Sequence, residues 1–211
     1  MDSLVFQDYR IWVKDQAMPK GERAVLLAGL DLFAKYGYNG TSTAQIAELA
    51  QVSQATIFKY FKTKKELLFA IIKPIFSNLV PFYRDNFLQK MDDLVSLEDF
   101  VHYIVSDRFA FIKTNADAIT IIFTELLTSE EVGEMFNDVL KKSRTVFSEH
   151  FGRSLQRLEI NPELDVATVF RTFIGQLLAY FLQRRLVPQL PHDEAHDLRL
   201  IEQQIIRAIQ K

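Results

Sequence analysis

The chain has 211 residues, of which 48% are hydrophobic, and a formal net charge of −2. This length and composition favour a folded protein of one or two domains and exclude a disordered chain. The absence of cysteine excludes disulfides and thiolate metal sites, and it fits a cytoplasmic protein. We also expect neither a signal peptide nor a membrane span, since no basic segment precedes an apolar run near residue 1 and no uncharged apolar stretch reaches about 18 residues.

Helical periodicity runs through most of the chain, with only seven Gly and six Pro and no sustained alternation of apolar and polar residues. Residues 1–18 form an N-terminal extension in which apolar residues over 4–13 have helical spacing. This extension is either an arm that contacts DNA or a helix that packs on the first domain. The next amphipathic helix is predicted over residues 22–36, with Gly37 as its C-cap.

Residues 42–67 are the most informative segment of the chain. Ser42 with Gln45, and Thr63 with Glu66, have the spacing of capping boxes, which begin helices. Short helices are predicted over residues 43–50 and 54–60, separated by a tight turn. Two short crossed helices in this order are typical of a helix-turn-helix, in which the second helix enters the major groove of DNA.

The charge distribution supports contact with DNA at this segment. Residues 54–65 contain no Asp or Glu and four lysines, Lys59, Lys62, Lys64 and Lys65. Residues 67–211 contain 16 Lys and Arg against 20 Asp and Glu, a net charge of −4. A basic end on an acidic body is expected where only one end meets phosphate, although a solvated helix end would give the same local pattern.

Short or polar side chains on the outward faces of these helices are the predicted DNA contacts. Gln54 can pair with adenine, Ala55 or the Thr56 methyl can meet a thymine methyl, and Lys59 and Tyr60 suit phosphates. Alternatively, Tyr60 packs on the first helix, and Gln54 and Thr56 are ordinary helix surface or capping residues. The full predicted set is Thr43, Ala44, Gln54, Ala55, Thr56, Lys59, Tyr60 and Lys64.

The rest of the chain is predicted to be helical. The helix that begins at Lys64 should kink at Pro74, and Pro81 marks a second break. Ser96, Ser129 and Asn161 are the predicted caps of later helices, with Pro162 at a first helical position. These later helices are predicted over residues 82–91, 97–113, 116–127, 130–158, 163–186 and 193–210.

Residues 22–70 resemble the DNA-binding domain of the TetR family of bacterial transcriptional regulators. Two positions depart from the family pattern: Gln51 stands where the turn usually has Gly, and Phe58 stands where the first of two aromatic residues is usually Tyr. A left-handed backbone at Gln51 would cost about 1 kcal/mol. The matching positions are Thr41, Ser42, Ile46, Ala47, Val52, Ser53, Thr56, Tyr60, Phe61, Lys64, Glu66 and Leu67.

This resemblance implies an all-α fold with a three-helix helix-turn-helix domain over residues 19–66 and a helical ligand-binding and dimerisation domain over residues 67–211. It implies a homodimeric repressor that leaves a near-palindromic operator when a small apolar or aromatic molecule binds. The aromatic residues of the second domain are either ordinary core or the lining of a ligand cavity. The residues predicted to bind ligand are Tyr83, Phe87, Tyr103, Asp107, Phe123, Phe170 and Phe173.

The last two predicted helices are expected to form an association surface, because residues 163–186 are apolar on much of the helix circumference, and the resemblance implies that this surface is the dimer interface. The alternative is that they form a core within one chain. Four charged residues could anchor the polar part of a ligand: Asp107, Arg108, Glu125 and Arg171. Alternatively, they form ordinary ion pairs. The predicted interface residues are Phe170, Ile174, Leu177, Leu178, Phe181, Ile201 and Ile205.

Enzymatic activity is not expected. No phosphate-binding glycine loop, nucleophile elbow or cysteine pair is present, and we predict no cofactor, no catalytic residue and no metal site. His192 and His196 lie four positions apart and could ligate zinc, but their spacing from the intervening Glu is not that of HExxH, and we favour a solvated helix start. A regulator that is constitutive, or controlled by a partner protein, is the main alternative to a ligand sensor.

Overall fold

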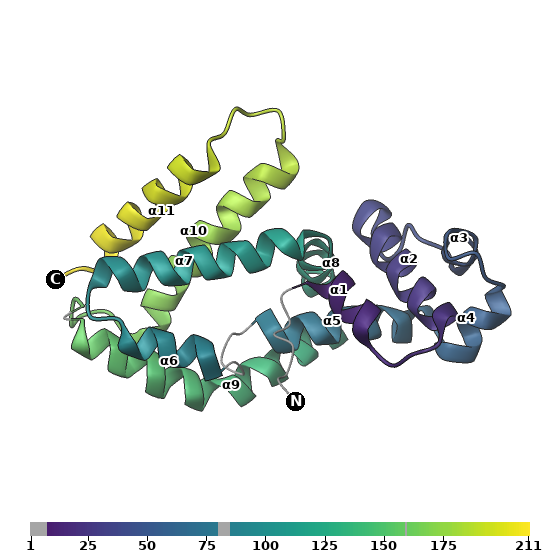
Figure 1. Cartoon of the computed structure of the whole chain (residues 1–211), viewed down its shortest axis with the longest axis horizontal. Coiled ribbons are helices and arrows are strands. Elements are labelled where there is room, and N and C mark those ends of the chain that lie inside the picture. The colour runs from purple at the N-terminus through teal and green to yellow at the C-terminus, as the bar shows by residue number, and fades with distance from the viewer. Residues whose placement is uncertain (1–7, 80–84, 159) are drawn as a thin grey trace. The chain divides into compact units, whose positions relative to one another are not determined.

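A computed structural model describes residues 8–79, 85–158 and 160–211. These residues are helical, and the only pairing of extended backbone among them is an isolated antiparallel bridge between Ile160 and Gln210. The all-helical class expected from the sequence is therefore confirmed (Figure 1). The predicted break at Pro81 and the predicted ligand residue Tyr83 lie outside the described residues.

The chain divides into two compact units. The first contains residues up to 83 together with residues 114–142, and the second contains residues 84–113 and 143–211. This division differs from the boundary expected near residue 66, because α8 packs on both α2 and α5 and so joins the helix-turn-helix. The helices of the first unit are α1 (Tyr9–Asp15), α2 (Lys20–Tyr36), α3 (Thr43–Leu49), α4 (Gln54–Tyr60), α5 (Lys64–Leu79), α8 (Ala116–Leu126) and the start of α9 (Glu130–Arg157).

The core of the first unit forms where α2 crosses α5. Val25 and Phe33 of α2 and Leu67 and Ile71 of α5 are almost fully buried. Gly29 of α2 lies at the crossing, where an added Cβ would come within 3.0 Å of the Ile71 Cδ1 atom and 3.3 Å of a Leu67 methyl. Glycine therefore allows the two helices to approach closely. α5 runs to Leu79 with Pro74 inside it.

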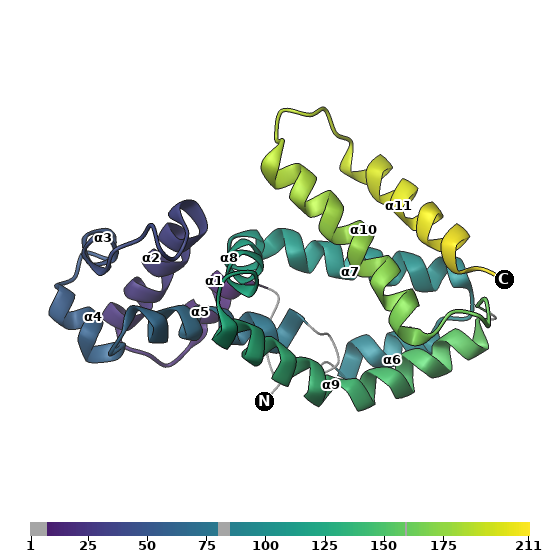
Figure 2. The same ribbon diagram turned by 180° about the vertical axis from the view of Figure 1, so that it is seen from behind.

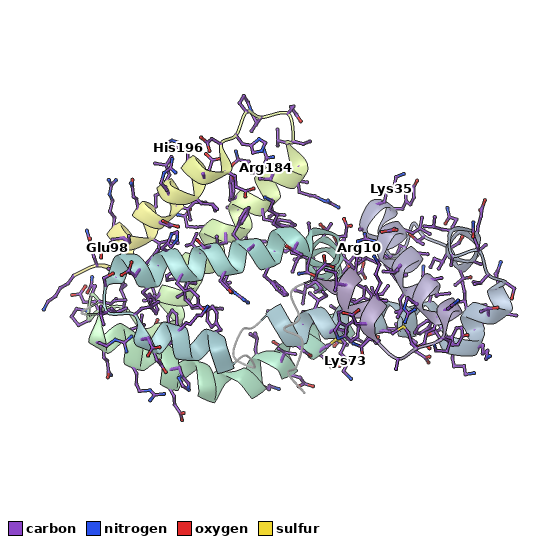
Figure 3. All side chains as sticks on the ribbon, viewed as in Figure 1. Arg10, Lys35, Lys73, Glu98, Arg184 and His196 are labelled. Atoms are coloured by element: carbon purple, nitrogen blue, oxygen red, sulfur yellow. The ribbon has the colours of Figure 1, made fainter. Side chains whose placement is uncertain are left out.

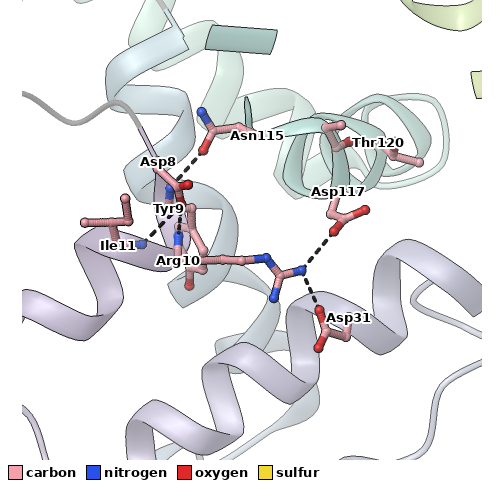
Figure 4. A network of polar contacts seen from close by, with 9 residues as sticks. Asp8, Tyr9, Arg10, Ile11, Asp31, Asn115, Asp117 and Thr120 are labelled. Carbon is pink, nitrogen blue, oxygen red and sulfur yellow. Dashed lines mark hydrogen bonds and ion pairs between the residues drawn. The ribbon is translucent and has the colours of Figure 1, made fainter. Parts of the chain in front are cut away.

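The N-terminal extension contains a helix that packs on the first unit (Figure 4). Asp8 caps α1, and Tyr9 and Val13 are buried. The Tyr9 amide donates to the Asn115 Oδ1 atom over 2.9 Å. One guanidinium nitrogen of Arg10 lies 2.6 Å from an Asp31 oxygen on α2 and 2.9 Å from an Asp117 oxygen on α8. Of the two predicted interpretations of this extension, the structure supports the packed helix for the described residues.

The second unit contains α6 (Asp85–Asp93), α7 (Leu97–Thr114), the later part of α9, α10 (Val166–Leu186) and α11 (Glu194–Ile209). Phe100 of α7 anchors its core through ring contacts with Phe151 of α9 and Phe173 of α10. α10 and α11 lie side by side in both views (Figures 1 and 2).

The predicted start of α10 was wrong. We expected Asn161 to cap a helix from residue 163, but α10 begins at Val166, and Asp165 caps it by accepting from the Thr168 amide at 2.7 Å. The Asn161 side chain instead accepts from the Glu163 amide, and the Asn161 amide donates to the Ile209 carbonyl at 3.0 Å. Asn161 is therefore held in a turn beside the end of α11.

Candidate nucleic-acid interface and regulatory body

Local hydrogen bonds set the conformation of the helix-turn-helix. Ser42 and Gln45 form the complete predicted capping box at the start of α3. Ser53 caps α4 by accepting from the Thr56 amide. Between the two helices, Gln51 has φ of 54°, so the turn keeps a left-handed backbone at this position although the residue is not Gly. The Val52 amide returns to the Ala47 carbonyl over 3.0 Å and closes the turn.

The start of α5 is capped slightly differently from the prediction. Thr63 accepts from the Glu66 amide at 3.0 Å, as expected for a capping box. The Glu66 carboxylate, however, accepts from the Lys62 amide at 2.8 Å and not from the Thr63 amide. These two bonds satisfy the amides of Glu66 and Lys62 at the entry into α5.

The predicted DNA contacts divide by exposure. Ala44, Gln54, Ala55 and Lys59 are exposed. The remaining predicted residues, Thr43, Thr56, Tyr60 and Lys64, are partly covered. Since Ala44 lies in the first turn of α3 and the other exposed residues lie on α4, the accessible part of the predicted surface spans both short helices.

Tyr60 and Thr56 lie against the start of α2. An added Cβ at Gly21 would meet the Tyr60 ring at 3.4 Å and the Thr56 methyl at 3.5 Å. The Thr56 hydroxyl also lies 2.9 Å from the Ser53 hydroxyl, within the cap of α4. The packing interpretation therefore describes the Tyr60 ring, and the capping interpretation describes the Thr56 hydroxyl.

The four lysines of residues 54–65 have different partners. Lys65 forms an ion pair with Glu131 on α9, and this contact lowers the pKa of Glu131 to about 2. Lys59 lies over the Tyr60 ring at 5.5 Å. Among the residues that the structure describes, neither Lys59 nor Lys62 is in an ion pair, and both are exposed. Lys59 and Lys62 are therefore the lysines of this segment best placed to meet phosphate.

Lys64 has partners within its own unit. Its ammonium donates to the Tyr38 carbonyl over 2.8 Å and to the Thr41 carbonyl over 2.9 Å. It also lies 4.1 Å from the centroid of the Tyr38 ring. Sequence reasoning missed these partners, because Tyr38 and Thr41 precede Lys64 by 26 and 23 positions and carry no local signal for the contact.

Glu125 is a buried carboxyl group on α8, with 5% of its surface exposed. Burial raises its pKa, and the positive charge of Lys64 partly opposes that increase. Glu125 was one candidate for a polar ligand anchor. The structure places it in the first unit with α2 and α5, whereas Asp107, Arg108 and Arg171 are in the second.

Three of the predicted ligand residues lie together in the second unit. The rings of Phe87 and Tyr103 stack with centroids 5.0 Å apart. Asp107 forms an ion pair with Arg108, whose guanidinium lies 5.1 Å from the Phe87 centroid and 5.3 Å from that of Phe111. A buried cation among aromatic rings is thus next to this part of the predicted set.

The other predicted ligand residues lie elsewhere. Phe173 is buried in ring contacts with Phe100 and Phe151, as expected for a core residue. Phe170 is half-buried on α10. Phe123 is on α8 and belongs to the first unit.

The predicted dimer residues fall into two groups. Ile174 is 42% exposed, and Phe170 and Leu178 are half-buried. The others are buried within one chain and belong to its core, as the alternative interpretation requires: Leu177, Phe181, Ile201 and Ile205. Among the described helices, only α10 is long and apolar enough to cross a membrane, judged by length and composition alone. Core helices of soluble proteins can have the same length and composition.

Two histidines were considered as zinc ligands. His192 and His196 are both exposed, and His196 lies in the first turn of α11 (Figure 3). Within the described part of the chain, no group of three or more His, Cys, Asp or Glu side chains could hold a metal ion. Asp193 caps α11 by accepting from the His196 amide, which fits the solvated helix start.

Comparison with known proteins identifies the helix-turn-helix. Residues 25–71 match the family described as bacterial regulatory proteins, tetR family. The transcriptional regulator RutR of Escherichia coli is 39% identical over 62 residues, which are 29% of either chain. This match therefore covers less than a third of RutR. The fatty acid metabolism regulator protein of Bacillus subtilis is 19% identical over 186 residues, covering 88% of this chain and 91% of that protein.

Solved structures extend the likeness of fold to nearly the whole chain. The fatty acid degradation regulator FadR from Bacillus halodurans superposes with a TM-score of 0.70 at 20% identity, covering 91% of this chain and 97% of that one. FadR from Bacillus subtilis, in complex with stearoyl-CoA, has a TM-score of 0.64 at 19% identity, covering 87% and 95%. Residues 25–71 therefore carry a DNA-binding domain of the TetR family, and the solved structures extend only the likeness of fold beyond it.

Proposed function

We propose that this protein is a cytoplasmic, homodimeric repressor that leaves a near-palindromic operator when a small apolar or aromatic molecule binds its second unit. The observation that carries the DNA-binding part is the exposed face of the capped helix α4. Gln54, Ala55 and Lys59 lie exposed there, and α4 contains no acidic residue. Amide, methyl and ammonium groups on one short helix suit base edges and phosphates in the major groove.

The dimer is supported by the incomplete burial of α10. Only 28% of an 18-residue apolar stretch of this helix is buried within one chain, although seven of its 21 residues are Leu or Phe. Ile174, Phe170 and Leu178 are the accessible members of the predicted interface. A two-fold partner covering this face would place two copies of α4 on successive half-sites of a palindrome.

The ligand class is supported by the cluster of Phe87, Tyr103 and Arg108. An aromatic surface beside a buried cation suits an apolar molecule with an acidic or phosphorylated end. FadR of Bacillus subtilis was crystallised with stearoyl-CoA, a ligand of that description. We therefore propose a long-chain acyl thioester or a related amphipathic molecule as the ligand, with Asp107 orienting Arg108.

Selection of bound sequences from a random pool of duplex DNA, near physiological salt, tests the DNA-binding proposal. Enrichment of one near-palindromic sequence is the expected result. A folded sample that enriches none would contradict specific binding by the protein alone.

Thermal-shift measurements with acyl-CoA thioesters of increasing chain length test the ligand. Stabilisation that grows with chain length, together with loss of operator binding, is the expected result. A flat response across the series, in a protein that still binds its operator, would favour control by a partner protein.

A further inference from the structure

The loop between α2 and α3 precedes the first predicted DNA contacts, and several hydrogen bonds hold it. Gly37 ends α2 with φ of 75°. The buried Thr41 hydroxyl lies 2.9 Å from the Gly37 carbonyl and 3.1 Å from the Leu32 carbonyl. Gly40 has no room for a side chain, since an added Cβ would lie 2.3 Å from the Tyr36 carbonyl oxygen. The loop therefore has one tightly specified path.

Lys64 is the only described side chain from outside this segment that bonds to the loop carbonyls of Tyr38 and Thr41. Its ammonium bridges the two oxygens, and the Tyr38 ring covers it at 4.1 Å. Thr41 is followed directly by Ser42, the cap of α3, and by the predicted DNA contact Thr43. The ammonium group at the start of α5 thus contacts the residue directly before the cap of α3.

We infer that Lys64 is a positioning residue for DNA binding, which holds the start of α3 through the Tyr38 and Thr41 carbonyls and does not neutralise a phosphate. This inference rests on the proposed function only for its DNA readout. Two of the three ammonium protons point to carbonyl oxygens, and the aromatic ring covers the group. By contrast, Lys59 and Lys62 are exposed and form no ion pair among the described residues.

The salt dependence of operator binding separates the two roles. Affinity for DNA falls as salt rises, and removal of one phosphate contact makes the slope of log K against log salt less steep by about 0.9. Loss of a positioning residue instead lowers affinity at every salt concentration and leaves this slope unchanged. For Lys64→Met, we expect affinity to fall about tenfold with the wild-type slope. The matched control Lys59→Met is expected to make the slope less steep. A less steep slope for Lys64→Met than for the wild-type protein would overturn the inference.

Hydrogen exchange without DNA provides a second readout that does not depend on the operator. In Lys64→Met we expect faster exchange of the amides of residues 41–46, with α5 and α8 unchanged. Unchanged exchange in this segment would overturn the inference, even if no operator is found. Lys64→Arg keeps the charge but places a planar group where an ammonium bridges two oxygens. It should therefore show the same faster exchange, whereas a residue needed only for its charge would tolerate the change.

Discussion

Gln51 occupies a backbone conformation that L-residues adopt at a cost. Its φ of 54° lies in the left-handed region, and it is the only described non-glycine residue with positive φ. The turn between α3 and α4 requires this conformation, because the next amide must return to Ala47. The family pattern, which has Gly at this position, marked Gln51 as a place where strain could arise, but only the structure shows that the backbone is left-handed.

Gln51→Gly should stabilise the folded protein by about 0.5–1 kcal/mol, because relief of the left-handed strain exceeds the added freedom of glycine in the unfolded chain. Urea unfolding of the two proteins measures the difference. Gln51→Ala is the control, since it shortens the side chain but keeps the Cβ atom that causes the strain. An equal gain from both substitutions would show that the side chain, and not the backbone, is responsible.

Glu125 gives the first unit a dependence on pH. Burial raises its folded-state pKa above the ordinary value of 4.5, so the folded state binds the proton more tightly than the unfolded state. Stability that is present below pH 4.5 is therefore lost as pH rises through the folded-state pKa. Glu131 changes the stability with pH in the opposite direction. Its pKa is lowered in the folded state, so the stability that it contributes is lost on acidification.

Glu125→Gln keeps the shape of the side chain and removes its charge. We expect the variant to be more stable than the natural protein at neutral pH, with the difference shrinking below about pH 4.5. Unfolding free energies measured at both pH values test this. A variant that is less stable at neutral pH would show that the Lys64 charge outweighs the cost of burying the carboxylate.

At the level of the helix, α1 shows what holds an added element in place. Arg10 forms two ion pairs, but its side chain is 41% exposed and those of Asp31 and Asp117 are 46% and 37% exposed. Pairs of this exposure contribute about 0.2–1 kcal/mol each. Tyr9 is 2% exposed, and burial of a whole aromatic ring contributes more.

Tyr9→Ala should therefore destabilise the protein by about 3–5 kcal/mol, whereas Arg10→Ala should cost less than about 1–2 kcal/mol. Tyr9→Phe is the matched control. It removes only a buried hydroxyl that has no hydrogen-bond partner among the described residues, so it should cost nothing. Chemical denaturation ranks the three variants, and a larger loss from Arg10→Ala than from Tyr9→Ala would reverse this account.

Local signals explain which helices could be predicted. Ser42 and Thr63 were identifiable as caps because their partners lie three positions away. Asp165 was missed because Asn161 and Pro162, just upstream, carry an equally good start signal, and the contact of Asn161 with Ile209 favours the turn. The bridging of α2 and α8 by Arg10 could not be predicted, since Asp117 lies 107 positions away.

For the whole molecule, association through α10 is the property most open to measurement. Ile174→Glu places a charge on the exposed apolar face of α10 without disturbing the core formed by Leu177 and Phe181. Sedimentation equilibrium should show a natural dimer and a folded, monomeric variant. Val95→Glu, at a position that is 84% exposed, serves as the control and should remain dimeric. A dimeric Ile174→Glu variant would place the interface elsewhere.

The dependence of α1 on α8 also determines the order in which the protein is completed during synthesis. Asn115, the partner of the Tyr9 amide, is translated 106 residues later, and the first unit extends to residue 142. Contacts between segments so distant in sequence form late, because the intervening loop must close first. Until α8 has emerged from the ribosome, Tyr9 and the faces of α2 and α5 that meet α8 have no partner there. The helix-turn-helix is translated before α8, yet the unit that contains it cannot be finished until α8 has been made.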